Sequence, residues 1–161
     1  MRKLLIFLLV LPFFCCDLVA SPDFKEYTGK VTRIIDGDTF EVLLEGNRTE
    51  KIRLNAIDCP ERGQDFYAVA RKGLSELIFQ KEVKIRLLYY DRYQRAIADV
   101  YLPDGQYVNA LMIQYGWAWH YKQYSNDTHL AELENKARTN KIGLWEHPNA
   151  TPPWEFRKKK K

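Results

Sequence analysis

The chain has 161 residues, enough for one folded domain, and it shows no internal repeat, no glycine-rich phosphate loop and no second domain. Its net charge of +4 at pH 7 is a modest basic excess, which suits a polyanionic partner without requiring one. The three histidines, His120, His129 and His147, are widely spaced and lack a Cys-x-x-Cys partner, so they give no argument for a zinc site.

Residues 1–20 have the pattern of a secretory signal peptide. Arg2 and Lys3 precede an apolar run over 4–16, and small side chains follow near Ala20. The run is shorter than the roughly 20 apolar residues that a membrane span needs. We therefore predict cleavage close to Ala20 and a mature protein that is secreted or periplasmic.

The cysteines bear on both processing and redox chemistry. A lipoprotein anchored through Cys15 or Cys16 is the alternative to simple cleavage, but bulky Phe13 and Phe14 stand where lipid attachment requires small residues. Cleavage would remove both cysteines and leave Cys59 alone, so the mature chain would form no internal disulfide. A catalytic thiol at Cys59 is disfavoured because no histidine lies nearby in sequence.

Alternating and β-branched runs predict five strands. The predicted strands are 31–35, 39–44, 51–54, 82–90 and 96–102. Asp-Gly between the first two is a strong hairpin signal, and we expect Gly37 to take the positive φ that glycine allows. Five strands in a meander, interrupted by one helix, favour a small closed barrel of the oligonucleotide-binding (OB) type.

Helical periodicity predicts three helices, over 65–80, 108–115 and 130–140. The first would pack an apolar stripe that includes Val69 on the sheet. Gly116 would end the second, and Asn126, Asp127 or Thr128 would cap the third. The expected fold class is therefore α+β, a five-stranded OB-fold β-barrel with three α-helices.

An aromatic segment at 117–124 follows the second predicted helix. We assign Trp117 and Trp119 to the core, because large aromatic side chains dominate burial. Tyr121 and Tyr124 are better candidates for substrate contact, since single-stranded nucleic acid is gripped by aromatic rings beside basic groups.

The last segment, residues 146–161, is a proline-rich and basic arm. We expect it to be extended along the surface. Its basic residues would add salt-sensitive, sequence-independent affinity for nucleic acid.

Five charged residues within 34–61 stand out as candidate site residues, on segments that otherwise have a strand-like pattern. They are Asp36, Asp38, Arg53, Asp58 and Glu61. Two carboxylates suit a hard cation such as calcium, Arg53 offers a rigid fork of donors that matches phosphate, and Glu61 could deprotonate a water. Asp-Gly-Asp-Thr alone is most often only a turn, but the combination indicates a metal-assisted phosphodiester hydrolase.

The chain resembles the thermonuclease family, the staphylococcal-nuclease-like (SNase-like) nucleases. The matching motifs are Ile35-Asp36-Gly37-Asp38-Thr39, Ile52-Arg53-Leu54, Ile57-Asp58-Cys59-Pro60-Glu61, Asp91-Arg92-Tyr93-Gln94-Arg95, and Val108-Asn109-Ala110-Leu111 leading to Gly116. The resemblance implies an SNase-like OB-fold domain over about 27–145, between the signal peptide and the arm.

The resemblance also implies residue roles. Calcium would be bound by Asp38, Asp58 and the backbone carbonyl of Cys59, where the best-known members have threonine. Asp36 would support these ligands without binding the metal. The catalytic residues implied are the general base Glu61 and the phosphate-binding Arg53 and Arg95. The candidate substrate contacts are Tyr93, Tyr121 and Tyr124.

The function expected from these features is that of an exported, calcium-dependent nuclease acting on DNA and RNA. Sequence preference should be low because the expected contacts are to phosphate, and the resemblance implies 3'-phosphate products. We expect a monomer that prefers single-stranded substrates and has no stable membrane partner. The alternative is a non-catalytic OB-fold nucleic-acid-binding module, but carboxylates at a polyanion site only repel the substrate unless a cation intervenes.

Overall fold

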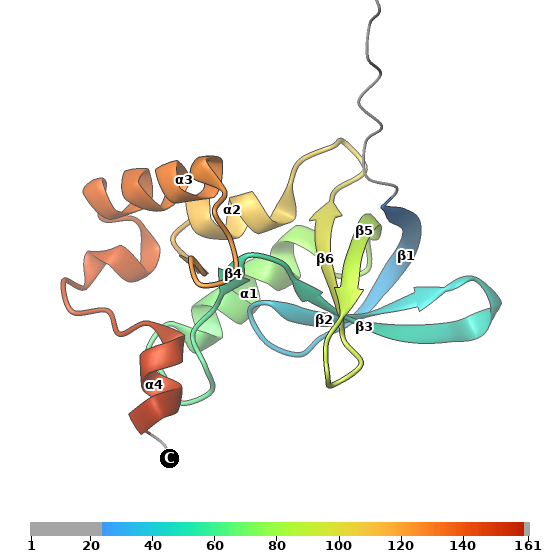
Figure 1. Cartoon of the computed structure of the whole chain (residues 1–161), viewed down its shortest axis with the longest axis horizontal. Helices are drawn as coiled ribbons and strands as arrows, with labels where there is room; N and C mark the ends of the chain where they lie inside the picture. Colours follow the sequence, from blue (N-terminus) through green and yellow to red (C-terminus); the bar gives the residue numbers. More distant parts are fainter. Residues whose placement is uncertain (1–23, 160–161) are drawn as a thin grey trace, which may run out of the picture.

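The computed structural model describes residues 24–159 (Figure 1), so the predicted signal peptide lies outside the described residues. Five strands form a closed barrel in the order β1-β2-β3-β6-β5. Their bounds are β1 Lys25–Ile34, β2 Thr39–Leu44, β3 Arg48–Leu54, β5 Glu82–Tyr90 and β6 Ala96–Tyr101. The predicted α+β class and the five-stranded barrel are confirmed.

The strand order differs from the expected meander. β3 pairs with β6, in parallel, whereas the other barrel pairs are antiparallel. The chain between β3 and β5 carries the first helix, so it can return at the far side of the barrel instead of beside β3. This crossover brings the start of β6 next to the end of β3, where Ile97 pairs with Arg53.

The barrel interior is filled by the alternating apolar residues of the strands. In β5, Val83, Ile85 and Leu87 are buried while Glu82 and Lys84 are exposed. Each fully buried aliphatic side chain contributes about 1.5–3 kcal/mol relative to exposure. This core holds the strand ends rigidly, and those ends carry the acidic residues described below.

Four α-helices and two short 3₁₀ helices complete the described chain. They are α1 Tyr67–Ile78, α2 Val108–Gln114, α3 Thr128–Thr139, α4 Pro153–Lys159, η1 Glu45–Asn47 and η2 Gly143–Glu146. The three expected helices are α1 to α3, and Asp127 caps α3 by accepting from the amides of His129 and Leu130. None of the helices within 24–159 is long and apolar enough to cross a membrane.

Two expectations about the helical parts are wrong. Val69, predicted on the buried stripe of α1, is 45% exposed, because the stripe that faces the core runs through Ala70, Leu74 and Ile78 instead. The arm predicted to be extended contains α4, which lies at the lower left in Figure 1, close to the C-terminal end of the described chain.

A second, two-stranded sheet was not predicted. β4 Ile57–Asp58 pairs with β7 Trp119–His120. Trp119 is buried, as expected, and packs with Trp145 at 5.2 Å between ring centroids. The pairing fixes the backbone of Asp58 at the side of the barrel.

Gly37 is needed for a reason other than the one expected. Its φ is not in the left-handed region occupied by Gly46, Gly63 and Gly105. A Cβ at Gly37 would instead lie 2.8 Å from the Cβ of Cys59 and 3.0 Å from that of Ala70. The absence of a side chain allows the Asp36–Asp38 turn to approach the chain that follows β4.

Candidate active site

Arg53, at the end of β3, joins the acidic residues at the edge of the barrel. Its Nη2 donates to Asp38 Oδ2 at 3.3 Å and to Asp58 Oδ1 at 3.0 Å. Its Nη1 donates to the backbone carbonyls of Leu54 and Ile57, both at 3.3 Å. The structure therefore brings together Arg53, Asp38 and Asp58, which were predicted from separate motifs. The Arg53 side chain is only 15% exposed.

Asp38 is held by the turn that precedes β2. Its carboxylate accepts from the Thr39 hydroxyl at 2.9 Å and from the Cys59 amide at 3.1 Å. Asp36 accepts in turn from the Asp38 amide at 3.1 Å. Asp36 thus contacts the backbone of Asp38, and the Cys59 peptide N–H ties the turn to the segment after β4.

The carboxylates crowd one another in a buried environment. Burial and the charge of Asp38 raise the pKa of Asp36 to about 7. Burial raises the pKa of Asp58 to about 6. The negative charge of Asp38 raises this pKa further, whereas Arg157 and Arg53 lower it. Burial opposes the charge of Arg53, but Asp38 and Asp58 outweigh burial and raise its pKa. The site carries more negative charge than its cations neutralise.

Cys59 contributes its backbone, and its thiol points into the core. The side chain is 4% exposed and belongs to the main hydrophobic cluster. Burial, followed by the charges of Asp38 and Asp58, raises the thiol pKa well above its ordinary value. The thiol therefore stays neutral, which agrees with rejecting a catalytic cysteine.

Glu61 lies at the open side of the cluster. Its side chain is 41% exposed, and its amide donates to Gln64 Oε1 at 2.8 Å. Exposure leaves the carboxylate accessible to water, and its neighbour along the chain is the rigid Cys59-Pro60 segment. This placement is consistent with the predicted role of a base.

Arg157, on α4, was not predicted as a site residue. Its Nη1 donates to Glu61 Oε1 at 2.6 Å and to Asp58 Oδ1 at 3.2 Å, and its Nη2 donates to Asp58 Oδ2 at 2.8 Å. The sequence around residue 157 indicates only a basic arm. No local pattern identifies Asp58, 99 residues away, as the partner of Arg157.

Arg95 is not brought into this cluster. It precedes β6 and pairs with Asp91, at 2.8 Å through Nε and 2.7 Å through Nη2. Because Ile97 is the strand partner of Arg53, Arg95 lies at the same end of the barrel as the cluster. To bind a phosphate beside Arg53, Arg95 would have to leave Asp91.

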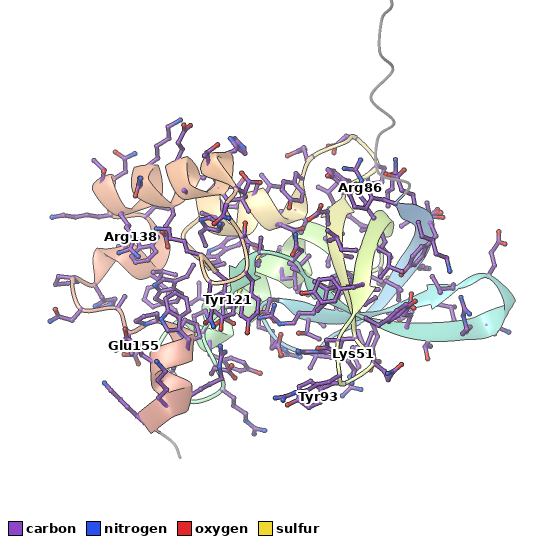
Figure 2. The ribbon with its side chains drawn as sticks, in the orientation of Figure 1. Lys51, Arg86, Tyr93, Tyr121, Arg138 and Glu155 are labelled. Carbon is purple, nitrogen blue, oxygen red and sulfur yellow. The ribbon has the colours of Figure 1, made fainter. Side chains whose placement is uncertain are left out.

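The three candidate tyrosines differ in their surroundings. Tyr93, in the β5–β6 loop, is 62% exposed, and Tyr124 is 64% exposed. The ring of Tyr121 is stacked on Trp154 of α4, with centroids 5.2 Å apart and ring planes within 4° of parallel. Figure 2 shows Tyr121 between the barrel and α4, whereas Tyr93 lies at the loop tip.

The arrangement of oxygens suits a hard cation. Asp38 Oδ2 and Asp58 Oδ1 lie within 3.3 Å of one nitrogen atom, so both can face a single positive charge. Across residues 24–159 there is no group of three or more His, Cys, Asp or Glu side chains arranged to hold a metal. The remaining ligands would therefore be backbone carbonyls, water and substrate, all of which calcium accepts.

The family model that matches this chain and three of its relatives are named as nucleases or nuclease homologues. Residues 51–147 match the family model described as "Staphylococcal nuclease homologue", a range that includes Arg53, Asp58, Glu61 and Arg95 but begins after Asp38. A protein named "Micrococcal nuclease" from Shigella flexneri is 40% identical over 154 residues, covering 89% of this chain and 88% of that protein.

Two further relatives extend the comparison. An "Uncharacterized endonuclease" from Escherichia coli O157:H7 is 38% identical over 163 residues, covering 99% of this chain and 100% of that protein. A "Staphylococcal-like nuclease CAN1" from Arabidopsis thaliana is 37% identical over 129 residues, covering 80% of this chain and 39% of that protein.

Proposed function

We propose that this chain, which belongs to the staphylococcal nuclease family, is an exported, calcium-dependent nuclease that hydrolyses phosphodiester bonds of DNA and RNA. The observation that carries the proposal is the contact of one Arg53 guanidinium with Asp38 and Asp58, beside the accessible carboxylate of Glu61. The residues that we propose as cation ligands, phosphate-binding group and base thus lie together at one edge of the barrel.

The residues of the site divide the chemistry among them. Asp38 and Asp58 would hold calcium, with the Cys59 carbonyl, and a bound divalent cation there would offset negative charge on the phosphate. Glu61 takes the proton of the attacking water, a role worth about 10²–10⁴-fold in rate. Arg53 donates to the phosphate oxygens as charge develops in the transition state, and Arg95 would join it after leaving Asp91.

Low sequence preference follows from the nature of these contacts. Arg53 and Arg95 address phosphate groups, which carry no sequence information, and the exposed Tyr93 and Tyr124 offer stacking surfaces that accept any base. A preference for single strands is proposed for the same reason, since unpaired bases can stack on such rings. Products with 3'-phosphate ends are proposed from family resemblance alone.

Export and oligomeric state are separate parts of the proposal. The basic and apolar pattern of residues 1–20 supports a cleaved signal peptide and release as a secreted or periplasmic protein, which we propose is a monomer. The mass of the mature N-terminus is the test. Cleavage near Ala20 without added lipid would support export of a free protein, and a lipid-modified Cys15 or Cys16 would contradict it.

The catalytic proposal is tested by Glu61→Gln in the purified mature chain. We expect hydrolysis of single-stranded DNA at saturating calcium to fall by about 10²–10⁴-fold, because the amide cannot accept the proton. Glu76→Gln is the matched control, since Glu76 is an exposed carboxylate on α1, and it should keep full activity. End-labelling of the products would identify which side of the cleaved bond keeps the phosphate.

Retained activity in Glu61→Gln would refute the assigned base. Binding of DNA without cutting by the unsubstituted chain, at any calcium concentration, would favour the non-catalytic OB-fold module instead.

A further inference from the structure

Helix α4 carries an arginine, Arg157, that contacts the carboxylates proposed to bind the metal and to act as the base. Arg157 contacts both carboxylate oxygens of Asp58 and one of Glu61, over distances of 2.6–3.2 Å. Asp58 Oδ1 also accepts from Arg53. Both oxygens of Asp58 are therefore already paired with arginine N–H groups.

A guanidinium bonded to both oxygens of Asp58 and a divalent cation bound to the same carboxylate repel each other. Arginine has only donors and stays charged at every relevant pH, so it cannot adapt by losing a proton. A cation bound directly to Asp58 would face Arg157 at close range, with like charges in a largely buried setting. Each of the two therefore disfavours binding of the other.

The rest of the arm is seated by specific contacts. Trp154 is stacked on Tyr121 at 5.2 Å, and Gln64 Nε2 donates to the Thr151 carbonyl at 2.9 Å. Figure 2 shows Glu155 on α4, on the same side of the molecule as Tyr121. Trp154 thereby covers the face of a tyrosine that we expected to stack on a base.

The same arm is suited to release. α4 has only seven residues, and an isolated helix of that length is marginal in water. The Arg157 side chain is 40% exposed, so water can replace its ion pairs. A cavity of about 380 Å³, lined by Gln64, Phe66, His147, Thr151 and Phe156 among others, lies beside the arm.

We propose that α4 is an autoinhibitory arm, in which Arg157 competes with the metal for Asp58 and Glu61 while Trp154 covers Tyr121. The proposal deepens the proposed function and depends on its assignment of Asp58 to cation binding. Calcium binding and arm docking are then linked, so each weakens the other by the same factor.

Calcium affinity is the first test, measured by isothermal titration calorimetry on the full mature chain. We expect Arg157→Gln to bind calcium about 5- to 50-fold more tightly, within the range of ordinary coupling between sites. Lys158→Gln is the matched control because it removes an equal charge from the next, exposed position of the same helix, and its affinity should equal that of the unsubstituted chain.

Hydrogen–deuterium exchange of the segment 152–159 is the second test, and it does not depend on activity. Exchange there should rise when calcium is added to the unsubstituted chain. In Arg157→Gln it should be high with or without calcium, because the anchoring ion pairs are gone.

These outcomes distinguish failure of the autoinhibitory arm from failure of the nuclease proposal. Equal or weaker calcium binding by Arg157→Gln, with exchange of 152–159 unaffected by calcium, would overturn the autoinhibitory arm and leave the nuclease proposal standing. Absence of calcium binding in every variant, together with absence of hydrolysis, would overturn both.

Discussion

Two buried charged clusters in this molecule have opposite balances of carboxylates and cations. Glu134, on α3, is a single carboxylate that accepts from Lys122 at 2.8 Å, from Arg138 at 3.3 Å and from the His120 amide at 3.3 Å. At the barrel edge, Asp36, Asp38 and Asp58 crowd together with Arg53 inside and Arg157 at the rim.

The difference between these clusters indicates which one is functional. The Glu134 cluster has more cations than anions, and its carboxylate is fully engaged, so it has the character of a structural anchor. The barrel-edge cluster has more anions than cations, and mutual repulsion helps to raise the pKa values of Asp36 and Asp58. Such a site gains stability by taking up a cation.

Among the variants that compare the two clusters, Arg53→Gln should have the largest effect. Hydrolysis of single-stranded DNA should fall by about 10²–10³-fold, because we assign transition-state stabilisation to Arg53, which also contacts Asp38 and Asp58. Arg48→Gln, an exposed arginine at the start of the same strand, is the control and should leave the rate unchanged. Near-normal hydrolysis by Arg53→Gln would contradict a catalytic role for the barrel-edge cluster.

Glu134→Gln should lower stability and leave chemistry intact. The free energy of unfolding should fall by about 2 kcal/mol, because two charge-assisted hydrogen bonds are weakened. Urea denaturation measures this, with the exposed Glu132→Gln on the same helix as control. A tenfold or greater loss of activity per folded molecule would contradict a purely structural role.

Asp36→Asn should act in the opposite direction. In chelator at pH 8, removing one of three crowded charges should raise the free energy of unfolding by about 1 kcal/mol, and asparagine can still accept from the Asp38 amide. The same denaturation measurement serves here. A loss of stability as large as that of Glu134→Gln would show that the two clusters are energetically alike.

The smallest effect concerns His120, between the two clusters. Burial lowers its pKa below the ordinary value, so the unfolded chain takes up the proton first as pH falls. Its contribution to stability is therefore complete above the unfolded pKa of about 6.5 and is lost progressively below it. Unfolding measured at pH 7 and pH 5 should show a loss that is smaller in His120→Gln; an equal loss would assign the dependence elsewhere.

The parts of this fold that could be predicted depend on local patterns. Strand alternation, as in Val83-Ile85-Leu87, and helical periodicity are properties of short windows, and they sufficed for the barrel and for α1 to α3. The grouping of Asp38, Arg53 and Asp58 followed because their motifs lie close together in sequence. Their assigned roles in metal binding and catalysis remain predictions.

The features that escaped prediction depend on distant contacts. The parallel β3–β6 pairing needs the helix crossover, and the need for Gly37 comes from Cys59 and Ala70. Arg157 reaches Asp58 only because Trp154 and Thr151 dock the arm. Arg95, which the resemblance paired with Arg53 as a phosphate-binding residue, instead forms an ion pair with Asp91, four residues earlier.

The most direct test of the central claim is hydrolysis of single-stranded DNA by the purified mature chain, with calcium and with a chelator. We expect cutting with calcium, loss of cutting with the chelator, and recovery when calcium is restored. Equal cutting in the presence of the chelator would contradict a role for the Asp38–Asp58 pair in holding a catalytic cation.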